Sequence, residues 1–125
     1  MKKIIITQSA PMPIGPYNQG VLSGDTLYTS GQIAINPETG ELEIEDIKSE
    51  TKLVMENLRA VLLEANMDFE NIVKCSIFIS DMNNFAQINE VYGTFFTDNF
   101  PARETVEVAC LPKNVNVEIS AIAVK

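Results

Sequence analysis

The stretch "DIKSETKLVMENLRAVLLEANMDFENIVKCSIFIS", residues 46–80, decides the fold class because the spacing of its apolar side chains changes once along its length. In its first part these side chains recur at steps of three and four residues, which predicts a helix with one buried stripe. Asp46 is a suitable N-cap for this helix and Asn66 a suitable end. In its last part they alternate, which predicts a strand. The helical stripe is Ile47, Thr51, Val54, Leu58, Val61, Leu62 and Ala65, and the strand face is Val73, Cys75, Ile77 and Ile79.

The segment before this helix is rich in strand and turn residues. "KKIIIT", residues 2–7, predicts a short first strand, and two more strand-like pieces flank a tight turn around residues 23–25. Between the first strand and this hairpin, "APMPIGPYNQ" holds three prolines and a glycine, so it is expected to be a loop. A second turn follows, with Pro37 and Gly40 at turn positions.

A second helix and two further strands are predicted after residue 80. The segments from Glu104 to Cys110 and from Val115 to Val124 flank "LPKN" and predict a closing hairpin. The order β-β-β-α-β-α-β-β predicts one α+β domain over residues 1–125, with a mainly antiparallel sheet and both helices on one face. The other face of the sheet is expected to meet solvent or a partner subunit. The second helix begins at about Asn83 and is expected to bury Phe85, Ile88, Val91, Tyr92 and Phe95.

Charge and composition exclude several classes of function. The formal net charge is -8, which argues against nucleic acid as the main partner because phosphate binding needs clustered Lys and Arg. The chain has no histidine, which excludes a Ser-His-Asp triad, a Cys-His dyad and histidine-based zinc sites. Any chemistry must therefore use carboxylates, Arg, Lys, Tyr, hydroxyls, thiols, backbone groups and water.

The apolar runs and cysteines predict a cytoplasmic protein. No apolar run reaches the length of a membrane span, and the first apolar run is too short for a signal peptide. Cys75 and Cys110 form no CxxC motif, which fits a reducing compartment, and both are expected in the core. The acidic run "GELEIEDIKSE", residues 40–50, is expected to be a solvated loop and helix start. Arg59, within the first helix, is expected to pair with a surface carboxylate.

The predicted closing hairpin restricts which side chains share a face, because opposed residues of an antiparallel pair point the same way. Burial of its apolar face favours a register that encloses residues 110–113 as the loop. This register places Thr105 opposite Glu118 and Arg103 opposite Ser120. The expected result is a polar face that holds all four side chains, with Arg103 and Glu118 as diagonal neighbours.

Two interpretations of Arg103 and Glu118 stay open on the residues alone. They form a structural ion pair across two strands on a solvated face, or they form an anion clamp beside a general base. A guanidinium group can hold a carboxylate through two parallel hydrogen bonds, which a lysine cannot do. The chain contains only two arginines, so one at the head of an apolar strand is expected to hold something.

Four stretches in a fixed order carry a resemblance to a known family. They are "APMPIGPYNQGV", "LYTSGQIAINPETGEL", "INEVYGTFF" and "PARETVEVACLPKNVNVEISAIAV". Together they make the chain resemble the RidA (YjgF) family of reactive-intermediate deaminases along almost its whole length. The resemblance implies a chorismate-mutase-like α+β fold and a homotrimer with clefts between subunits. It also implies hydrolysis of 2-imino acids, such as 2-iminopropanoate (from 2-aminoacrylate) and 2-iminobutanoate, to 2-keto acids and ammonia, with no metal or organic cofactor.

The resemblance further implies roles for individual residues. Arg103, in the "PAR" motif, would hold the substrate carboxylate, and Glu118, in the last strand, would position and activate the hydrolytic water. Tyr17, in the "GPY" motif, would join the catalytic group as a proton relay. Ser30 and Gly31 of "SGQ" and Asn89 of "INEVY" would complete the substrate site.

The sequence departs from the common pattern of the family at two positions of this site. Thr105 stands where many members have cysteine; its backbone N–H and hydroxyl can still bind a ligand, but thiol chemistry is lost. Ser120 stands where many members have a second glutamate. These departures affect the expected substrate preference more than the expected reaction.

Other functions compete with the deaminase. One is a non-enzymatic regulatory trimer whose Arg103 clefts bind 2-keto acids, and Glu118 is the residue that discriminates between the two. Another is an RNA-cleaving or translation-inhibiting protein, an activity attached to this family, which the net charge of -8 and the absence of histidine disfavour.

Overall fold

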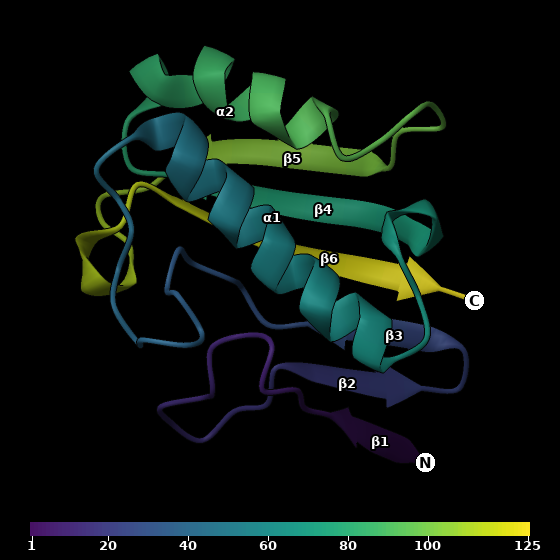
Figure 1. Ribbon diagram of the computed structural model, residues 1–125. Coiled ribbons are helices and arrows are strands. Elements are labelled where there is room, and N and C mark those ends of the chain that lie inside the picture. The colour runs from purple at the N-terminus through teal and green to yellow at the C-terminus, as the bar shows by residue number, and fades with distance from the viewer.

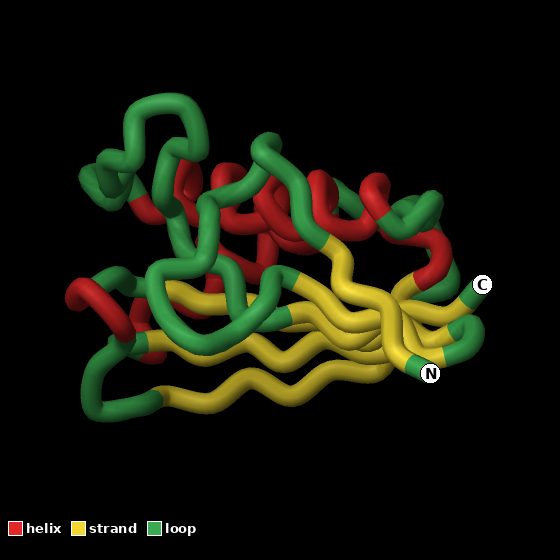
Figure 2. The backbone as a smooth tube through the Cα atoms, turned by 90° about the horizontal axis from the view of Figure 1, so that it is seen from below, coloured by secondary structure: helices red, strands yellow, loops and turns green.

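The computed structural model describes residues 1–125, which form a six-stranded sheet with two helices on one face (Figure 1). Seen along the sheet, the helices make one layer and the strands the other (Figure 2). The predicted α+β class and element order are confirmed. No helix has both the length and the apolar content to cross a membrane. The elements are β1 Lys2–Ile5, β2 Gly20–Ser23, β3 Thr26–Thr29, α1 Ile47–Glu64, β4 Ile72–Ile79, α2 Phe85–Gly93, β5 Ala102–Glu107 and β6 Val117–Val124, with 3-10 turns η1 Phe69–Asn71, η2 Met82–Asn84 and η3 Pro112–Asn114.

Helix α1 has the predicted ends. The Asp46 side chain accepts a hydrogen bond from the backbone N–H of Ser49, which caps the first turn. At the other end Asn66 adopts a left-handed φ of 59°, and the Met67 N–H bonds back to the carbonyl of Leu62. The apolar stripe of α1 packs on the sheet and forms the core with the inward side chains of the strands. Helix α2 lies beside α1, along the β5 edge of the sheet (Figure 1).

The predicted face of strand β4 is wrong at its first residue. Val73 is 49% exposed, whereas Ile72 is buried. The pairing of β4 with β6 shifts between Ile72 and Lys74, which is a β-bulge. The extra residue reverses the alternation at this point. Cys75, Ile77 and Ile79 therefore keep the inward positions that were expected.

The predicted closing hairpin is also wrong, because β5 and β6 are not neighbours. The strand order is β1-β2-β3-β6-β4-β5, with β4 between them. β5 pairs with β4 in parallel and all other pairs are antiparallel. The segment between β5 and β6 crosses the end of β4, where the Val108 N–H bonds to the carbonyl of Ile79 and the Ser80 N–H to that of Asn116.

The burial of the two strands explains this order. Every second residue of β6, from Val117 to Ala123, is buried, and such a strand gains most in the middle of a sheet. Strand β5 carries charged side chains at Arg103, Glu104 and Glu107, which suit an edge strand. The buried face of β6 was predicted correctly, but the expected burial of the apolar face of β5 is wrong, since Val106 is exposed. Alternation does not specify which strand is the neighbour.

The strand order overturns the predicted polar face. Arg103 lies opposite Cys75, which lies opposite Ala121, so this row faces the helices. Glu118 lies opposite Phe78, on the other face of the sheet. Arg103 and Thr105 therefore share one face, and Glu118 and Ser120 share the opposite one.

The sheet face away from the helices carries large apolar side chains. Ile4, Tyr28 and Val106 are exposed there, and Phe78 and Ile122 are half-buried. The two cysteines have different environments. Cys75 is in the core, as predicted, but Cys110 is exposed in the crossing segment after β5.

Candidate functional site

Arg103 stands at the edge of the sheet against helix α2. Its Nη1 donates a 2.7 Å hydrogen bond to Oδ1 of Asn89. Its guanidinium carbon lies 5.1 Å from the ring centre of Tyr92 and 5.6 Å from that of Phe85. Asn89 and Arg103 were both expected at the site, and the structure brings them into direct contact through α2 and β5.

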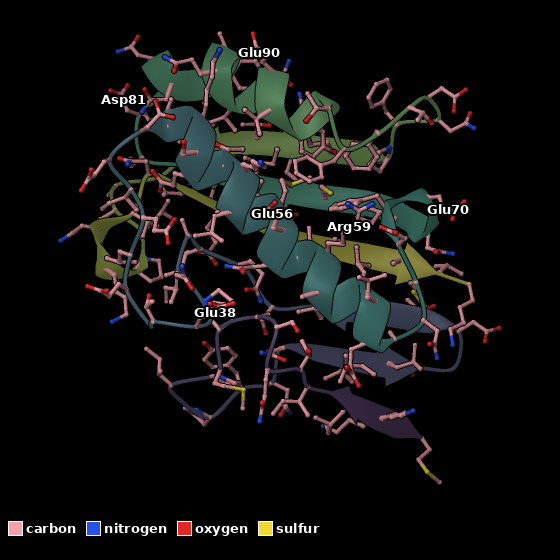
Figure 3. All side chains as sticks on the ribbon, viewed as in Figure 1. Glu38, Glu56, Arg59, Glu70, Asp81 and Glu90 are labelled. Carbon is pink, nitrogen blue, oxygen red and sulfur yellow. The ribbon has the colours of Figure 1, made fainter.

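The other arginine provides a comparison within the same chain. Arg59 also lies over an aromatic ring, with its guanidinium carbon 5.3 Å from the centre of the Phe69 ring. It pairs with Asp68, its Nε lying 3.1 Å from Oδ1, as expected for a surface ion pair. Figure 3 shows Arg59 on α1, beside the turn that leads to β4.

Arg103 has no carboxylate partner, since the three ion pairs of the protomer involve Lys48, Arg59 and Lys74. Its neighbour Glu104 points to the opposite face and pairs with Lys74. The positive charge of Arg103 is held in place by an amide and two aromatic rings only. Such a guanidinium is available to bind an anion, because no internal counter-ion has to be displaced.

Thr105 lies two residues along β5 on the same face as Arg103. Its hydroxyl oxygen is buried and has no hydrogen-bond partner. A buried hydroxyl without a partner is costly, so a ligand atom or a water at this point would be stabilised by it. The structure thus adds an unsatisfied polar group on the same face as Arg103.

Tyr17, Ser30, Gly31 and Glu118 come together at a second place. They line one cavity of about 710 Å³ between the Pro-rich loop, the segment after β3 and the crossing segment before β6. Burial raises the pKa of the Glu118 carboxyl above its usual value of 4.5. Gly31 lies so close to Glu118 that a side chain there would meet its Cδ at 2.7 Å.

Buried amides hold the loops that form this cavity. Gln19 is 1% exposed, and its Nε2 donates to the carbonyls of Thr7, Ala10 and Pro11, which fixes the Pro-rich loop. Asn57 of α1 is buried in the same way and donates to the carbonyls on the opposite wall, at Ile33 and Ile35. Neither residue was predicted from the sequence, since a single Gln or Asn within a loop or helix carries no periodic signal.

Glu50 corrects the expectation that residues 40–50 are solvated throughout. It is 0% exposed, and its two carboxylate oxygens accept hydrogen bonds from the backbone N–H and the side-chain amide of Asn116, at 2.8 and 2.7 Å. Burial raises its pKa, although these hydrogen bonds act in the other direction. Glu50 therefore fixes the start of β6, two residues before Glu118.

Within one chain the expected site residues form two separate groups. Arg103, Asn89 and Thr105 lie on the helix-covered face at the β5 edge. The group around Glu118 lines the cavity on the other side of β4. The expected direct approach of Arg103 to Glu118 is wrong for a single protomer. No cluster of three or more carboxylate or thiol side chains is arranged to hold a metal ion.

Comparison with known proteins identifies relatives over the full length of the chain. Residues 7–125 match the family model described as Endoribonuclease L-PSP. The chain is 47% identical over 125 residues to a RutC family protein of Pyrococcus horikoshii, covering 100% of this chain and 99% of that protein. It is 46% identical over 128 residues to the 2-iminobutanoate/2-iminopropanoate deaminase of Escherichia coli, covering 100% and 99%. The crystal structure of E. coli TdcF with bound serine superposes with a TM-score of 0.95 at 48% identity, covering 98% of each chain.

Proposed function

The chain belongs to the RidA (YjgF) family, whose model is described as Endoribonuclease L-PSP, and on this premise we propose that it hydrolyses 2-imino acids to 2-keto acids and ammonia. The observation that carries the proposal is the Arg103 guanidinium, which is fixed by Asn89 and two rings yet lacks a carboxylate partner. It suits the carboxylate that every 2-imino acid has beside its reacting carbon. The relative named 2-iminobutanoate/2-iminopropanoate deaminase supports the same substrate class.

We further propose that the working site lies between two protomers of a homotrimer. The chemistry needs an anion clamp and a base at one substrate, but Arg103 and Glu118 belong to separate groups in one protomer. A cyclic assembly brings a given surface of one copy against a different surface of the next. Each cleft would then combine the Arg103 group of one copy with the Glu118 group of its neighbour. The apolar face of the sheet, with Tyr28, Phe78 and Val106, is suited to burial in such an assembly.

The reaction then follows from the two groups. Arg103 holds the substrate carboxylate, which fixes the imine carbon relative to a water beside Glu118. The imine reacts in its protonated form: Glu118 accepts a proton from the water as the water oxygen bonds to the imine carbon and the C=N double bond becomes a C–N single bond. The proton then passes from Glu118, directly or through Tyr17, to the amine nitrogen of the carbinolamine. Glu118 next accepts the hydroxyl proton as the C–O bond becomes a carbonyl and the C–N bond breaks, and it returns this proton to the released ammonia or to solvent, so the products are a 2-keto acid and ammonia.

The cavity around Glu118 favours this role of a base. Burial raises the pKa of the carboxyl, and a higher pKa makes a carboxylate a stronger proton acceptor near neutral pH. Ser30 and Gly31 line the same cavity, and the close approach of Gly31 limits the positions open to Glu118. All groups needed for the steps are present in this chain, so the mechanism requires no cofactor.

A coupled assay tests the proposal. An amino-acid oxidase or threonine dehydratase generates 2-iminopropanoate or 2-iminobutanoate, and the loss of the imine is followed with the parent protein, Arg103→Ala and Arg59→Ala. The parent should accelerate imine loss. Arg103→Ala should lose roughly 10- to 100-fold in kcat/KM, the range for a charged hydrogen-bonded contact, and Arg59→Ala should keep parental activity. Equal rates for the parent and Arg103→Ala would defeat the proposal.

A binding protein for 2-keto acids is the second candidate. It is favoured by the related TdcF, whose structure was determined with bound serine, a ligand with the same carboxylate group. Binding needs Arg103 but not the basicity of Glu118, so replacement of Glu118 separates the two functions. Cleavage of RNA fits less well despite the description of the family model, because the chain carries a net charge of -8 and no histidine. Tight, salt-insensitive RNA binding would contradict this argument.

A further inference from the structure

We propose that Tyr92 is a positioning residue for Arg103: its ring is a fixed platform that holds the guanidinium ready for the substrate carboxylate. The catalytic part of this inference rests on the proposed function, whereas the structural part does not. Tyr92 itself would not touch the substrate. It would act through the orientation of Arg103.

The spacing of residues on α2 builds the platform. Phe85, Asn89 and Tyr92 occur at steps of four and three residues, so all three project from one face of the helix. This face meets Arg103 on β5, with one ring on each side of the amide that accepts its hydrogen bond. Two aromatic rings and one amide, all neutral and all from α2, therefore fix the orientation of the Arg103 guanidinium.

Tyr92 is the immobile member of this group. It is 3% exposed, whereas Phe85 is only partly buried. Its ring packs against Phe96 at 5.0 Å between centres, and Phe96 packs in turn against Phe69 at 5.5 Å. A ring enclosed in an aromatic cluster cannot rotate away from the guanidinium without disturbing the core.

The ring of Tyr92, rather than its hydroxyl, carries the role. The hydroxyl is buried and bonds to no nitrogen or oxygen atom, and its polar neighbour is the Cys75 thiol. Burial raises the pKa of the Tyr92 phenol and raises the pKa of the Cys75 thiol to about 11, so both groups are neutral near pH 7. The layer beneath Arg103 thus supplies an aromatic face and no counter-ion.

A fixed guanidinium binds an anion better than a mobile one. An unrestrained arginine side chain loses rotamer freedom when it binds, and this loss reduces affinity. Arg103 is exposed, and a cation over an aromatic face is attracted by the quadrupole of the ring at exposed sites as well. Because the carboxylate is bound in both the ground state and the transition state, loss of the platform should raise KM and leave kcat nearly unchanged.

The kinetic test compares Tyr92→Leu with Tyr92→Phe. Tyr92→Leu removes the aromatic face, and its KM for 2-iminobutanoate and Kd for 2-ketobutanoate should rise about three- to tenfold, as expected for one cation–π contact. Tyr92→Phe keeps the face and should restore parental values. Val61→Ala is the control for a general loss of packing, because Val61 is buried beside Gly20 of β2, across the sheet from β5. A rise in KM with Val61→Ala equal to that with Tyr92→Leu would show a general loss of packing and overturn the proposal.

A spectroscopic test needs no enzymatic activity. The chain has two arginines, so a ¹H–¹⁵N spectrum of the Nε–H groups should contain two signals, which Arg59→Lys assigns. Tyr92→Leu should shift and broaden the Arg103 signal, and Val61→Ala should leave that signal unchanged. An Arg103 signal unchanged by Tyr92→Leu would refute the platform, even if the protein proved inactive towards imines. A shifted signal in an inactive protein would leave the platform standing and refute only the proposed function.

Discussion

Arg103 and Glu118 point to opposite faces of one sheet, and strand β4 lies between the strands that carry them. The row through Arg103 includes Cys75 and faces the helices, while the row through Glu118 includes Phe78 and faces away from them. An ion pair between the two side chains within one protomer is thereby excluded. If both act on one substrate, they must come from different copies of the chain.

Complementation between two impaired variants tests a shared site. Alone, Arg103→Ala should keep about a tenth or less of the parental activity and Glu118→Gln about a hundredth or less. Mixed trimers contain clefts that combine an intact Arg103 from one variant with an intact Glu118 from the other. Random mixing at equal amounts should restore about a quarter of the parental activity, since each cleft of a cyclic assembly draws one side from each of two copies. The measurement is imine loss after unfolding and refolding the two proteins together.

The absence of any recovery in the mixture would contradict a site between protomers. A necessary control refolds each variant alone and mixes them afterwards without exchange. Activity in that sample should stay at the level of the single variants, because no cleft then contains both intact residues.

Glu118→Gln separates catalysis from binding. The amide keeps the size of the side chain but cannot accept a proton from water. The kcat for 2-iminobutanoate should fall roughly 100- to 10,000-fold, the usual contribution of a general base. The Kd for 2-ketobutanoate, measured by calorimetry, should change little because Arg103 still holds the carboxylate. Unchanged turnover would show that Glu118 is not the base, and the binding function would then be the better description.

The elements were predictable from sequence because they depend on local patterns. The stripe of α1, its Asp46 cap and the turn at Gly24 each follow from the spacing or conformation of neighbouring residues. The strand order was not predictable in this way. Segments β5 and β6 are close in sequence and alternate like a hairpin, but the insertion of β4 between them depends on the burial of the whole sheet. The bulge at Val73 is a second long-range effect, since it appears only when β4 is paired with β6.

The candidate site was predictable as a set of residues but not as an arrangement. Its residues were assigned from the resemblance, and the geometry sorts them into the Arg103 group and the Glu118 cavity. The supporting residues were missed. Gln19, Asn57 and Glu50 are buried polar side chains that bond to loop backbone, and only the three-dimensional structure reveals which carbonyls and amides need partners.

Gly31→Ala tests the close approach of the segment after β3 to the base. A Cβ at Gly31 would lie 2.7 Å from Cδ and 2.9 Å from Cγ of Glu118, so the carboxylate must move. The backbone φ of Gly31 is not in the left-handed region, and the displaced group is a side chain, so the fold should tolerate the change. Activity should fall on the order of 100-fold, the effect of moving a reacting group by about 1 Å.

Gly93→Ala is the control for this variant. A Cβ at Gly93 meets no atom within 4 Å, and the residue is helical. It should leave kcat/KM unchanged and raise the free energy of unfolding by about 0.5–1 kcal/mol. If Gly31→Ala kept parental activity, Glu118 would not need its present position for catalysis.

Glu50 should make the stability of the protein depend on pH. Its side chain is 0% exposed, and burial raises its pKa in the folded protein above the usual 4.5. The folded state therefore binds this proton more tightly than the unfolded state. The stabilisation it supplies is complete below pH 4.5 and is lost as the pH rises through the folded-state pKa. Each unit of difference in pKa corresponds to about 1.4 kcal/mol.

Glu50→Gln should remove this dependence. The amide stays neutral, and its oxygen can still accept one hydrogen bond from Asn116. We expect the free energy of unfolding of Glu50→Gln, relative to the parent, to increase between pH 4 and 8, apart from a constant offset for the altered hydrogen bonds. Urea titrations at a fixed protein concentration measure this difference. Glu56→Gln, on the exposed face of α1 (Figure 3), is the matched control for the loss of one carboxylate. A difference for Glu50→Gln that does not change with pH would mean that the buried carboxyl has the same pKa in the folded and unfolded states, so that its hydrogen bonds to Asn116 fully offset the cost of burial.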